Sequence, residues 1–121
     1  MNYTQEVNQT KNIGRQFEEE ARDFLMEKGY QILTMNYHSR FGEIDIIAQD
    51  DDTIVFIEVK YRSSDKFGHP VETVDFAKQQ RILETAKFYI MKTENHNAAC
   101  RFDVIGIFKG EIEHIENAFG E

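Results

Sequence analysis

The sequence of 121 residues has one cysteine, one proline and no hydrophobic run of membrane-spanning length. The single cysteine, Cys100, has no partner for an internal disulfide, which fits a reducing compartment. Residues 1–11 are too polar for a secretory signal peptide. These absences predict a cytoplasmic protein that does not insert into a membrane.

Basic residues are also scarce. The chain has 14 lysines and arginines against 22 aspartates and glutamates, a formal net charge of −8. Because affinity for a phosphate backbone normally depends on lysine and arginine, this balance argues against nucleic-acid binding. Net charge is a global sum, however, whereas binding depends on the local patch, and a bound cation reverses the local field. The composition therefore argues against a nucleic-acid partner but does not exclude one.

The length and composition predict one folded domain. Apolar residues make up 40% of the chain and aromatic residues 12%, which is enough for a single hydrophobic core. No repeat, linker or low-complexity segment divides the sequence. We expect a flexible N-terminal segment over residues 1–11, one domain over 12–116 and a C-terminal tail over 117–121.

Two segments have helical periodicity. The first is 12–28, which we expect to end at Gly29. The second is 75–92, with Thr73 or Asp75 as its N-cap. The apolar stripe of the first is Ile13, Phe17, Ala21, Phe24 and Leu25, and that of the second is Phe76, Leu83, Ala86 and Ile90.

Five segments are predicted to be strands from their apolar and β-branched residues. They are 30–37, 43–49, 53–61, 101–108 and 111–116. Three acidic residues between the second and third predict a hairpin turn. The element order is thus αβββαββ, and an α/β fold with a mixed central sheet flanked by helices is the natural packing.

The candidate site lies in Gly42-Glu43-Ile44-Asp45 and Phe56-Ile57-Glu58-Val59-Lys60. Side chains alternate along a strand, so Glu58 and Lys60 point the same way. Asp45 and Glu58 are the oxygen ligands that Mg²⁺ or Mn²⁺ prefers, and the Val59 carbonyl is a further candidate ligand. Lys60 would orient or deprotonate a water that attacks phosphorus, or neutralise charge in the transition state. Glu18, at the border of the first helix's apolar stripe, would complete this catalytic set.

A simpler interpretation makes Glu58 and Lys60 a same-face ion pair on a solvated strand, because charged pairs on strands are common. The strand is otherwise apolar on both faces, as a central strand is. Ionisable groups there are unfavourable unless they are paired or bind an ion. Asp45 has a similar setting, between Ile44 and Ile46.

Basic residues near the motif are candidates for a nucleic-acid-binding rim, although a solvated surface explains them about as well. They are Arg62, Lys66, His69, Lys78 and Arg81. Arg101 and Asp103 share a strand face, and we interpret them mainly as a structural pair. His38, His96 and His114 have no metal-ligand spacing, so we expect them at the surface.

These motifs, taken in order, resemble the YraN family of small bacterial proteins. The similarity runs from about Asn12 to Phe108. Besides the strand motifs it includes Gly14 with Glu18 and Ala21, Gly29-Tyr30, Arg62, Phe67-Gly68-His69-Pro70, Lys78, Arg81-Ile82 and Arg101-Phe102-Asp103. That family is similar to the PD-(D/E)xK nuclease-like superfamily.

The resemblance implies a three-layer, restriction-endonuclease-like fold. It maps the metal carboxylates onto Asp45 and Glu58, the motif lysine onto Lys60 and the helix glutamate onto Glu18. The sequence departs from the pattern where Phe17 replaces the usual glycine before the helix glutamate, and where Ile44 replaces the usual proline before Asp45. Neither departure removes a ligand.

Two functions follow. The first is a Mg²⁺- or Mn²⁺-dependent nuclease acting on DNA, with branched or damaged DNA as candidate substrates, and a homodimer would suit the cleavage of two strands. The second is a non-catalytic module of the same fold that binds nucleic acid or a protein partner, which the acidic charge favours.

Overall fold

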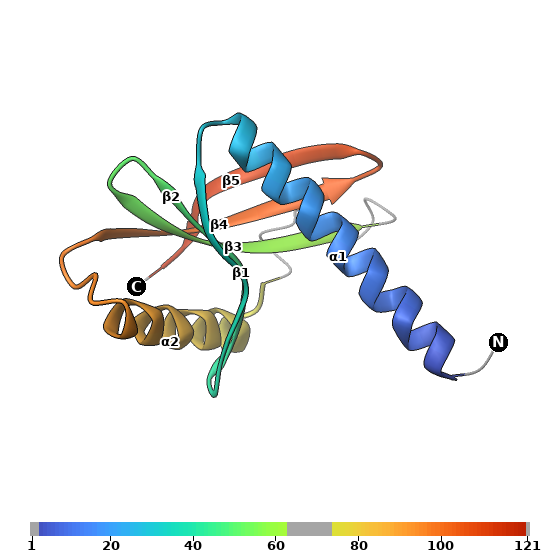
Figure 1. The fold of residues 1–121 in the computed structure, drawn as a ribbon, viewed down its shortest axis with the longest axis horizontal. Helices are drawn as coiled ribbons and strands as arrows, with labels where there is room; N and C mark the ends of the chain where they lie inside the picture. Colours follow the sequence, from blue (N-terminus) through green and yellow to red (C-terminus); the bar gives the residue numbers. More distant parts are fainter. Residues whose placement is uncertain (1–2, 63–73, 121) are drawn as a thin grey trace.

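The computed structural model describes residues 3–62 and 74–120 (Figure 1), with only the backbone described for 3–12 and for residue 62. The element order confirms the predicted αβββαββ arrangement. The elements are α1 (Tyr3–Glu27), β1 (Gln31–Ser39), β2 (Gly42–Asp50), β3 (Thr53–Arg62), α2 (Phe76–Lys92), β4 (Ala99–Phe108) and β5 (Glu111–Phe119). Two predicted element bounds were wrong. The helix expected over 12–28 begins before residue 12, and the strand expected over 111–116 continues beyond residue 116.

The five strands form one mixed sheet in the order β1-β2-β3-β4-β5. All neighbours are antiparallel except β3 and β4, which pair in parallel from Thr53 with Ala99 to Arg62 with Phe108. Parallel strands need a long crossover, and α2 lies within that connection. The predicted mixed sheet is therefore confirmed.

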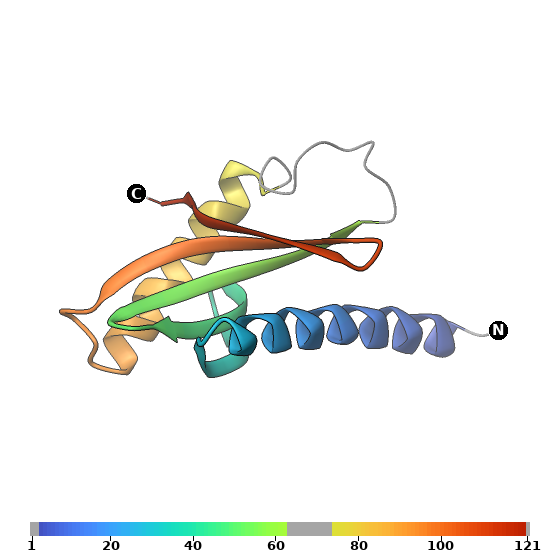
Figure 2. The ribbon, with the colours of Figure 1, turned by 90° about the horizontal axis from the view of Figure 1, so that it is seen from above.

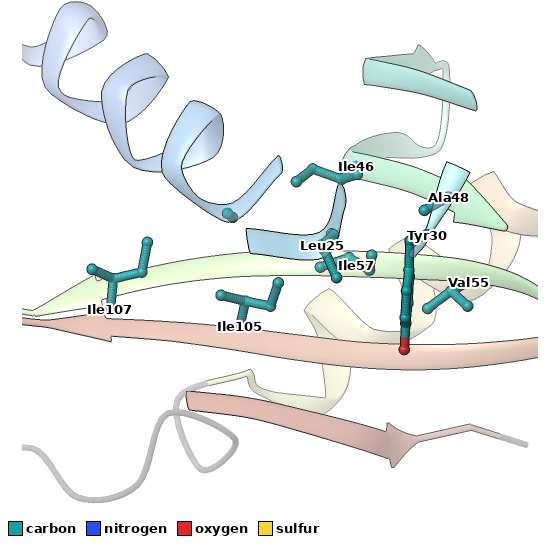
Figure 3. Close-up of a cluster of buried hydrophobic side chains, with 9 residues drawn as sticks. Leu25, Tyr30, Ile46, Ala48, Val55, Ile57, Ile105 and Ile107 are labelled. Carbon is teal, nitrogen blue, oxygen red and sulfur yellow. The ribbon is translucent and has the colours of Figure 1, made fainter. Parts of the chain in front are cut away.

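One helix covers each face of the sheet (Figure 1). On one face, Ala21 and Leu25 of α1 pack against the sheet in a fully buried cluster, shown in Figure 3. The strand residues of this cluster are Ile46, Ala48, Val55, Ile57, Ile105 and Ile107. On the other face, Ile82, Ala86 and Tyr89 of α2 pack against a second cluster that includes Ile47, Phe56 and Val104.

Helix α1 ends as its sequence predicts. Gly29 has a φ of +94°, a backbone conformation that glycine adopts without a steric penalty. Its N–H donates to the Met26 carbonyl and the N–H of Tyr30 donates to the Leu25 carbonyl, both at 3.0 Å. These two bonds form a Schellman motif, and Tyr30 and Leu25 belong to the same buried cluster.

Each predicted helix stripe contains one error, at its N-terminal end. Ile13 is 45% exposed and Phe76 is 73% exposed. Helical side chains tilt toward the N-terminus, so a residue in the first contacting turn projects past the sheet. Figures 1 and 2 show the N-terminal turns of α1 extending beyond the strands. Asp75 is confirmed as the N-cap of α2, since its carboxylate accepts from the Lys78 N–H at 2.8 Å.

Arg101 and Asp103 form the predicted structural pair, with Arg101 Nε 2.9 Å from Asp103 Oδ1. Asp103 is fully buried and also accepts from the Asn117 N–H at 2.9 Å, at a bulge in the β4–β5 pairing. Its other oxygen lies 2.7 Å from His114 Nε2. The prediction that His114 is at the surface was wrong, because its side chain is only 3% exposed.

In the described part of the chain, neither helix combines the length and hydrophobicity that a membrane span requires.

Candidate active site

The site forms where two neighbouring strands separate. The pairs between β2 and β3 run from Asp50 with Thr53 to Ile46 with Ile57 and stop there, whereas β3 stays paired with β4 as far as Arg62. Beyond Ile57, the Asp45 carboxylate replaces the neighbouring backbone and accepts from the Val59 N–H at 2.8 Å. The N–H and C=O of one strand residue face the same neighbour, so the Val59 carbonyl also faces this opening.

A cavity of about 330 Å³ occupies the opening. Its walls include all four predicted catalytic residues, which come from three elements: Glu18 from α1, Asp45 from β2, and Glu58 and Lys60 from β3. A smaller cavity of about 140 Å³ reaches Asp45 and Glu58 again and is bordered by α2. The fold thus brings together side chains that are 42 positions apart in the chain, from Glu18 to Lys60.

The carboxylates of this cavity repel one another in a poorly solvated setting. Burial, followed by the charge of Glu58, raises the pKa of Asp45 to about 8, although the hydrogen bond from the Val59 N–H opposes the shift. Burial also raises the pKa of Glu18; a hydrogen bond to Asn36 partly offsets it, and Glu43 and Glu58 add to it. A cation bound here would relieve both penalties.

The donor set fits a hard divalent cation with few protein ligands. Asp45, Glu58 and the Val59 carbonyl supply oxygen only, and Mg²⁺ often takes one or two carboxylates and keeps several waters. Among the described side chains, those of residues 13–61 and 74–120, no group of three or more His, Cys, Asp or Glu is arranged to hold a metal. Asp45, Glu58 and the Val59 carbonyl could therefore hold only a cation that keeps most of its ligands as water.

The two lysines beside Glu58 are not equivalent. Glu58 is 5% exposed, and its Oε1 lies 2.6 Å from Lys78 Nζ but 3.9 Å from Lys60 Nζ. Burial, followed by the charge of Lys78, lowers the pKa of Lys60. Burial alone would lower the pKa of Lys78 too, but the hydrogen bond and charge of Glu58, with smaller contributions from Lys60 and Asp45, together raise it. Of the two lysines, Lys78 therefore holds its proton more strongly and Lys60 less strongly.

The ion pair of Glu58 with Lys60 that the simpler interpretation expected is present at 3.9 Å, but Lys78 forms a shorter one at 2.6 Å. The sequence places Lys78 only near the start of a helix, and nothing in its pattern shows that α2 directs this residue toward β3. Of the predicted nucleic-acid rim, Arg81 is exposed and borders the smaller cavity. Arg62 has only its backbone described, and Lys66 and His69 lie outside the described residues.

Gly42 lets the start of β2 approach α2 and so positions Asp45. A Cβ at residue 42 would lie 3.3 Å from the Arg81 Cβ and 3.5 Å from the Thr85 hydroxyl, at a φ of +156°. We expect Gly42→Ala to reduce the free energy of unfolding by about 1–3 kcal/mol, measured by urea denaturation.

Gly14→Ala is the matched control, because nothing lies within 4 Å of a Cβ there and the residue is in helix α1. This variant should be neutral or stabilise by about 0.5–1 kcal/mol. Equal effects of the two substitutions would show that the close approach at Gly42 is unimportant.

Comparison with known proteins identifies the family. The uncharacterised protein family UPF0102 matches residues 17–107, which include all four predicted catalytic residues. The chain belongs to this family. It is the YraN family that the motifs predicted.

Curated UPF0102 proteins from several bacteria are similar over most of their length. One from Thermodesulfovibrio yellowstonii is 50% identical over 88% of this chain and 95% of its own. One from Persephonella marina is 45% identical over 88% of this chain and 91% of its own. One from Clostridioides difficile is 48% identical over 84% and 91%. The activity proposed for this UPF0102 chain rests on the geometry of its cavity.

Proposed function

We propose that this UPF0102 protein is a nuclease of the restriction-endonuclease-like fold that uses Mg²⁺ or Mn²⁺ to hydrolyse phosphodiester bonds in DNA. The observation that supports it best is the convergence of Asp45, Glu58 and Lys60 on one cavity at the opening between β2 and β3. The raised pKa of Asp45 also supports it, because strongly shifted carboxylates in a cavity are typical of functional sites.

Each residue has a distinct part in the proposed reaction. Asp45 and Glu58, with the Val59 carbonyl, hold the cation, which when bound supplies charge neutralisation and activation of water. Lys60 Nζ accepts the proton of the water whose oxygen attacks phosphorus, as the lowered pKa of Lys60 allows. The P–O ester bond opposite the attacking oxygen breaks, and the leaving oxygen takes a proton from a second water. Lys78, which keeps its charge, donates to a non-bridging phosphate oxygen. Glu18 positions a water on the α1 side of the cavity.

The proposed substrate is DNA with a branch or a lesion. The proposed location is the cytoplasm, and the proposed assembly is a homodimer in which two such cavities act on two strands. The formal charge of −8 opposes binding through an extended basic surface, so we expect the affinity to come mainly from the cavity and its rim.

A second candidate is a module of the same fold that binds nucleic acid or protein without cleaving. The 2.6 Å ion pair between Lys78 and Glu58 favours it, because this lysine occupies the position where a cation would sit beside Glu58. The two candidates differ in whether a divalent cation displaces Lys78.

Calorimetry with Mn²⁺ at low salt separates them when the two partners of this ion pair are removed one at a time. Wild type should bind Mn²⁺, and Glu58→Gln should abolish binding by removing a ligand. Lys78→Gln should strengthen binding about tenfold, because a competing charged hydrogen bond is lost. Wild type and Glu58→Gln would then be assayed for cleavage of nicked, branched, duplex and single-stranded DNA.

The proposed nuclease requires that Glu58→Gln loses Mn²⁺ binding and that Lys78→Gln binds Mn²⁺ more tightly. If wild type binds no Mn²⁺ and Lys78→Gln gains none, the ion pair is structural and the non-catalytic module is the better description. Circular dichroism of each variant would show that the fold is retained.

A further inference from the structure

Two aromatic rings form one wall of the catalytic cavity. Phe17 of α1 and Tyr61 of β3 stack with their centroids 4.3 Å apart and their planes within 11° of each other. Both residues line the cavity that contains Asp45, Glu58 and Lys60. Tyr61 is 47% exposed, so this stacked pair is open to solvent, unlike the stacked rings of Phe56 and Phe102, where Phe56 is buried.

Space is left beside the pair. Gly14 lies one helical turn before Phe17 and borders the same cavity, and a Cβ built on Gly14 meets nothing within 4 Å. A flat aromatic surface beside an open slot suits a planar ligand. The volume of about 330 Å³ is at the lower end of the range for small-molecule sites. It has room for about one nucleotide and not for a double helix.

We propose that Phe17 and Tyr61 form a stacking platform for an unpaired nucleobase next to the phosphate that is cleaved. The inference rests on the proposed nuclease function and specifies its substrate class as polynucleotides with unpaired residues. Every base has a flat face that stacks on an aromatic ring without regard to sequence. Bases inside a duplex are already stacked on their neighbours and cannot reach such a platform.

The charge of the protein supports the same conclusion. A chain with a net charge of −8 gains little from phosphate neutralisation over a long site unless basic residues cluster locally. The basic side chains among the described residues of this cavity are Lys60 and Lys78, enough to contact about one phosphate. Stacking is a non-electrostatic source of affinity, and the platform supplies it where the basic residues are few.

The test measures binding without cleavage, in Ca²⁺ at low salt. The probes are a 12-nucleotide single strand that contains 2-aminopurine and the same strand paired in a duplex. Wild type should bind the single strand more tightly and quench its fluorescence. Tyr61→Leu should weaken single-strand binding about tenfold and remove the quenching, and duplex binding should not change.

Two variants separate stacking from general damage. Tyr61→Phe keeps the ring and should bind within about twofold of wild type. Phe76→Leu removes an aromatic residue that is 73% exposed and does not line this cavity, and it should have no effect. Melting temperatures would confirm that all three variants are folded.

The proposed stacking platform and the proposed nuclease activity can be disproved separately. If Tyr61→Leu binds the single strand as wild type does, or if wild type prefers the duplex, the platform is overturned whether or not DNA is cleaved. If stacking is observed but no DNA is cleaved in Mn²⁺, the platform stands and the nuclease fails. If an aromatic peptide quenches Tyr61 fluorescence and oligonucleotides do not, the nucleobase assignment is wrong.

Discussion

Asp45→Asn should abolish metal-dependent cleavage and at the same time stabilise the metal-free protein at alkaline pH. The loss of activity, about a thousandfold or more, follows from removing a charged ligand from the cavity. The gain in stability follows from the raised pKa of Asp45, which burial and Glu58 bring to about 8 in the folded state. Asparagine fits the same space and still accepts the Val59 N–H.

The sign of the pH dependence is fixed by which state holds the proton. Between about pH 4, where an aspartate in the unfolded chain ionises, and pH 8, the folded state binds the proton more tightly than the unfolded state. Stability therefore falls as pH rises through this range. Asp45→Asn has no titrating group at this position, so it does not lose stability in this way as pH rises. It should be more stable than wild type by about 1–3 kcal/mol at pH 8.5, and the difference should shrink toward pH 4.

Urea denaturation in EDTA at pH 5.0 and 8.5 measures this difference. Asp52→Asn is the matched control, since Asp52 is an exposed residue of the turn between β2 and β3 and should change the free energy of unfolding by less than about 0.5 kcal/mol. Added Mn²⁺ should stabilise wild type but not Asp45→Asn. Parallel pH profiles for wild type and Asp45→Asn would show that Asp45 is an ordinary solvated carboxylate.

Periodicity and turn residues were sufficient to predict the element order and the two helix ends at Gly29 and Asp75. These features depend on local chemistry, which a sequence records directly. The errors at Ile13 and Phe76 have a different cause. Helical periodicity identifies the buried face of a helix, but it does not show where along its axis the helix leaves the sheet.

The candidate site was predictable as a set of residues but not as an arrangement. Strand alternation placed Glu58 and Lys60 on one face, and the apolar setting of Asp45 and the position of Glu18 on its helix made both candidates. The resemblance to the YraN family implied the same four residues. The separation of β2 from β3 after Ile57 is a property of sheet twist and packing that no local pattern states. The contact between Lys78 and Glu58 depends on the angle at which α2 crosses β3.

The burial of His114 could not be predicted from local sequence either. Its neighbours Glu113 and Ile115 gave no sign of burial, and its partners Asp103 and Lys28 come from distant parts of the chain. Lys28 Nζ lies 2.8 Å from His114 Nδ1, so this nitrogen accepts and Nε2–H donates to Asp103. His114 therefore links a lysine at the end of α1 to a buried carboxylate in β4.

Asp103→Asn should be among the most destabilising single substitutions in this fold. Asp103 is fully buried and accepts from Arg101, His114 and the Asn117 N–H. Removing its charge leaves the Arg101 guanidinium, 19% exposed, without its main counter-ion. Breaking a buried pair in this way costs about 3–5 kcal/mol, a large part of the 5–15 kcal/mol typical of a whole domain.

The pKa of Asp103 gives a second signature. Burial alone would raise this pKa, but the hydrogen bonds from His114, Arg101 and the Asn117 amide outweigh it, and the pKa is lowered. The stabilisation is therefore complete above about pH 4 and is lost as pH falls through the folded-state value. The difference between wild type and Asp103→Asn should be largest near neutral pH and should narrow in acid.

A graded series of variants tests whether Asp103 is the centre of this network. Arg101→Met should cost less than Asp103→Asn, because Asp103 keeps two other donors, His114 and the Asn117 N–H. Asp23→Asn, at a surface pair whose aspartate is 67% exposed, should cost less than about 0.5 kcal/mol. If Arg101→Met were the more damaging change, the stabilisation would come from the guanidinium over the Tyr30 ring, with Arg101 Cζ 6.0 Å from the ring centroid, and not from the buried carboxylate.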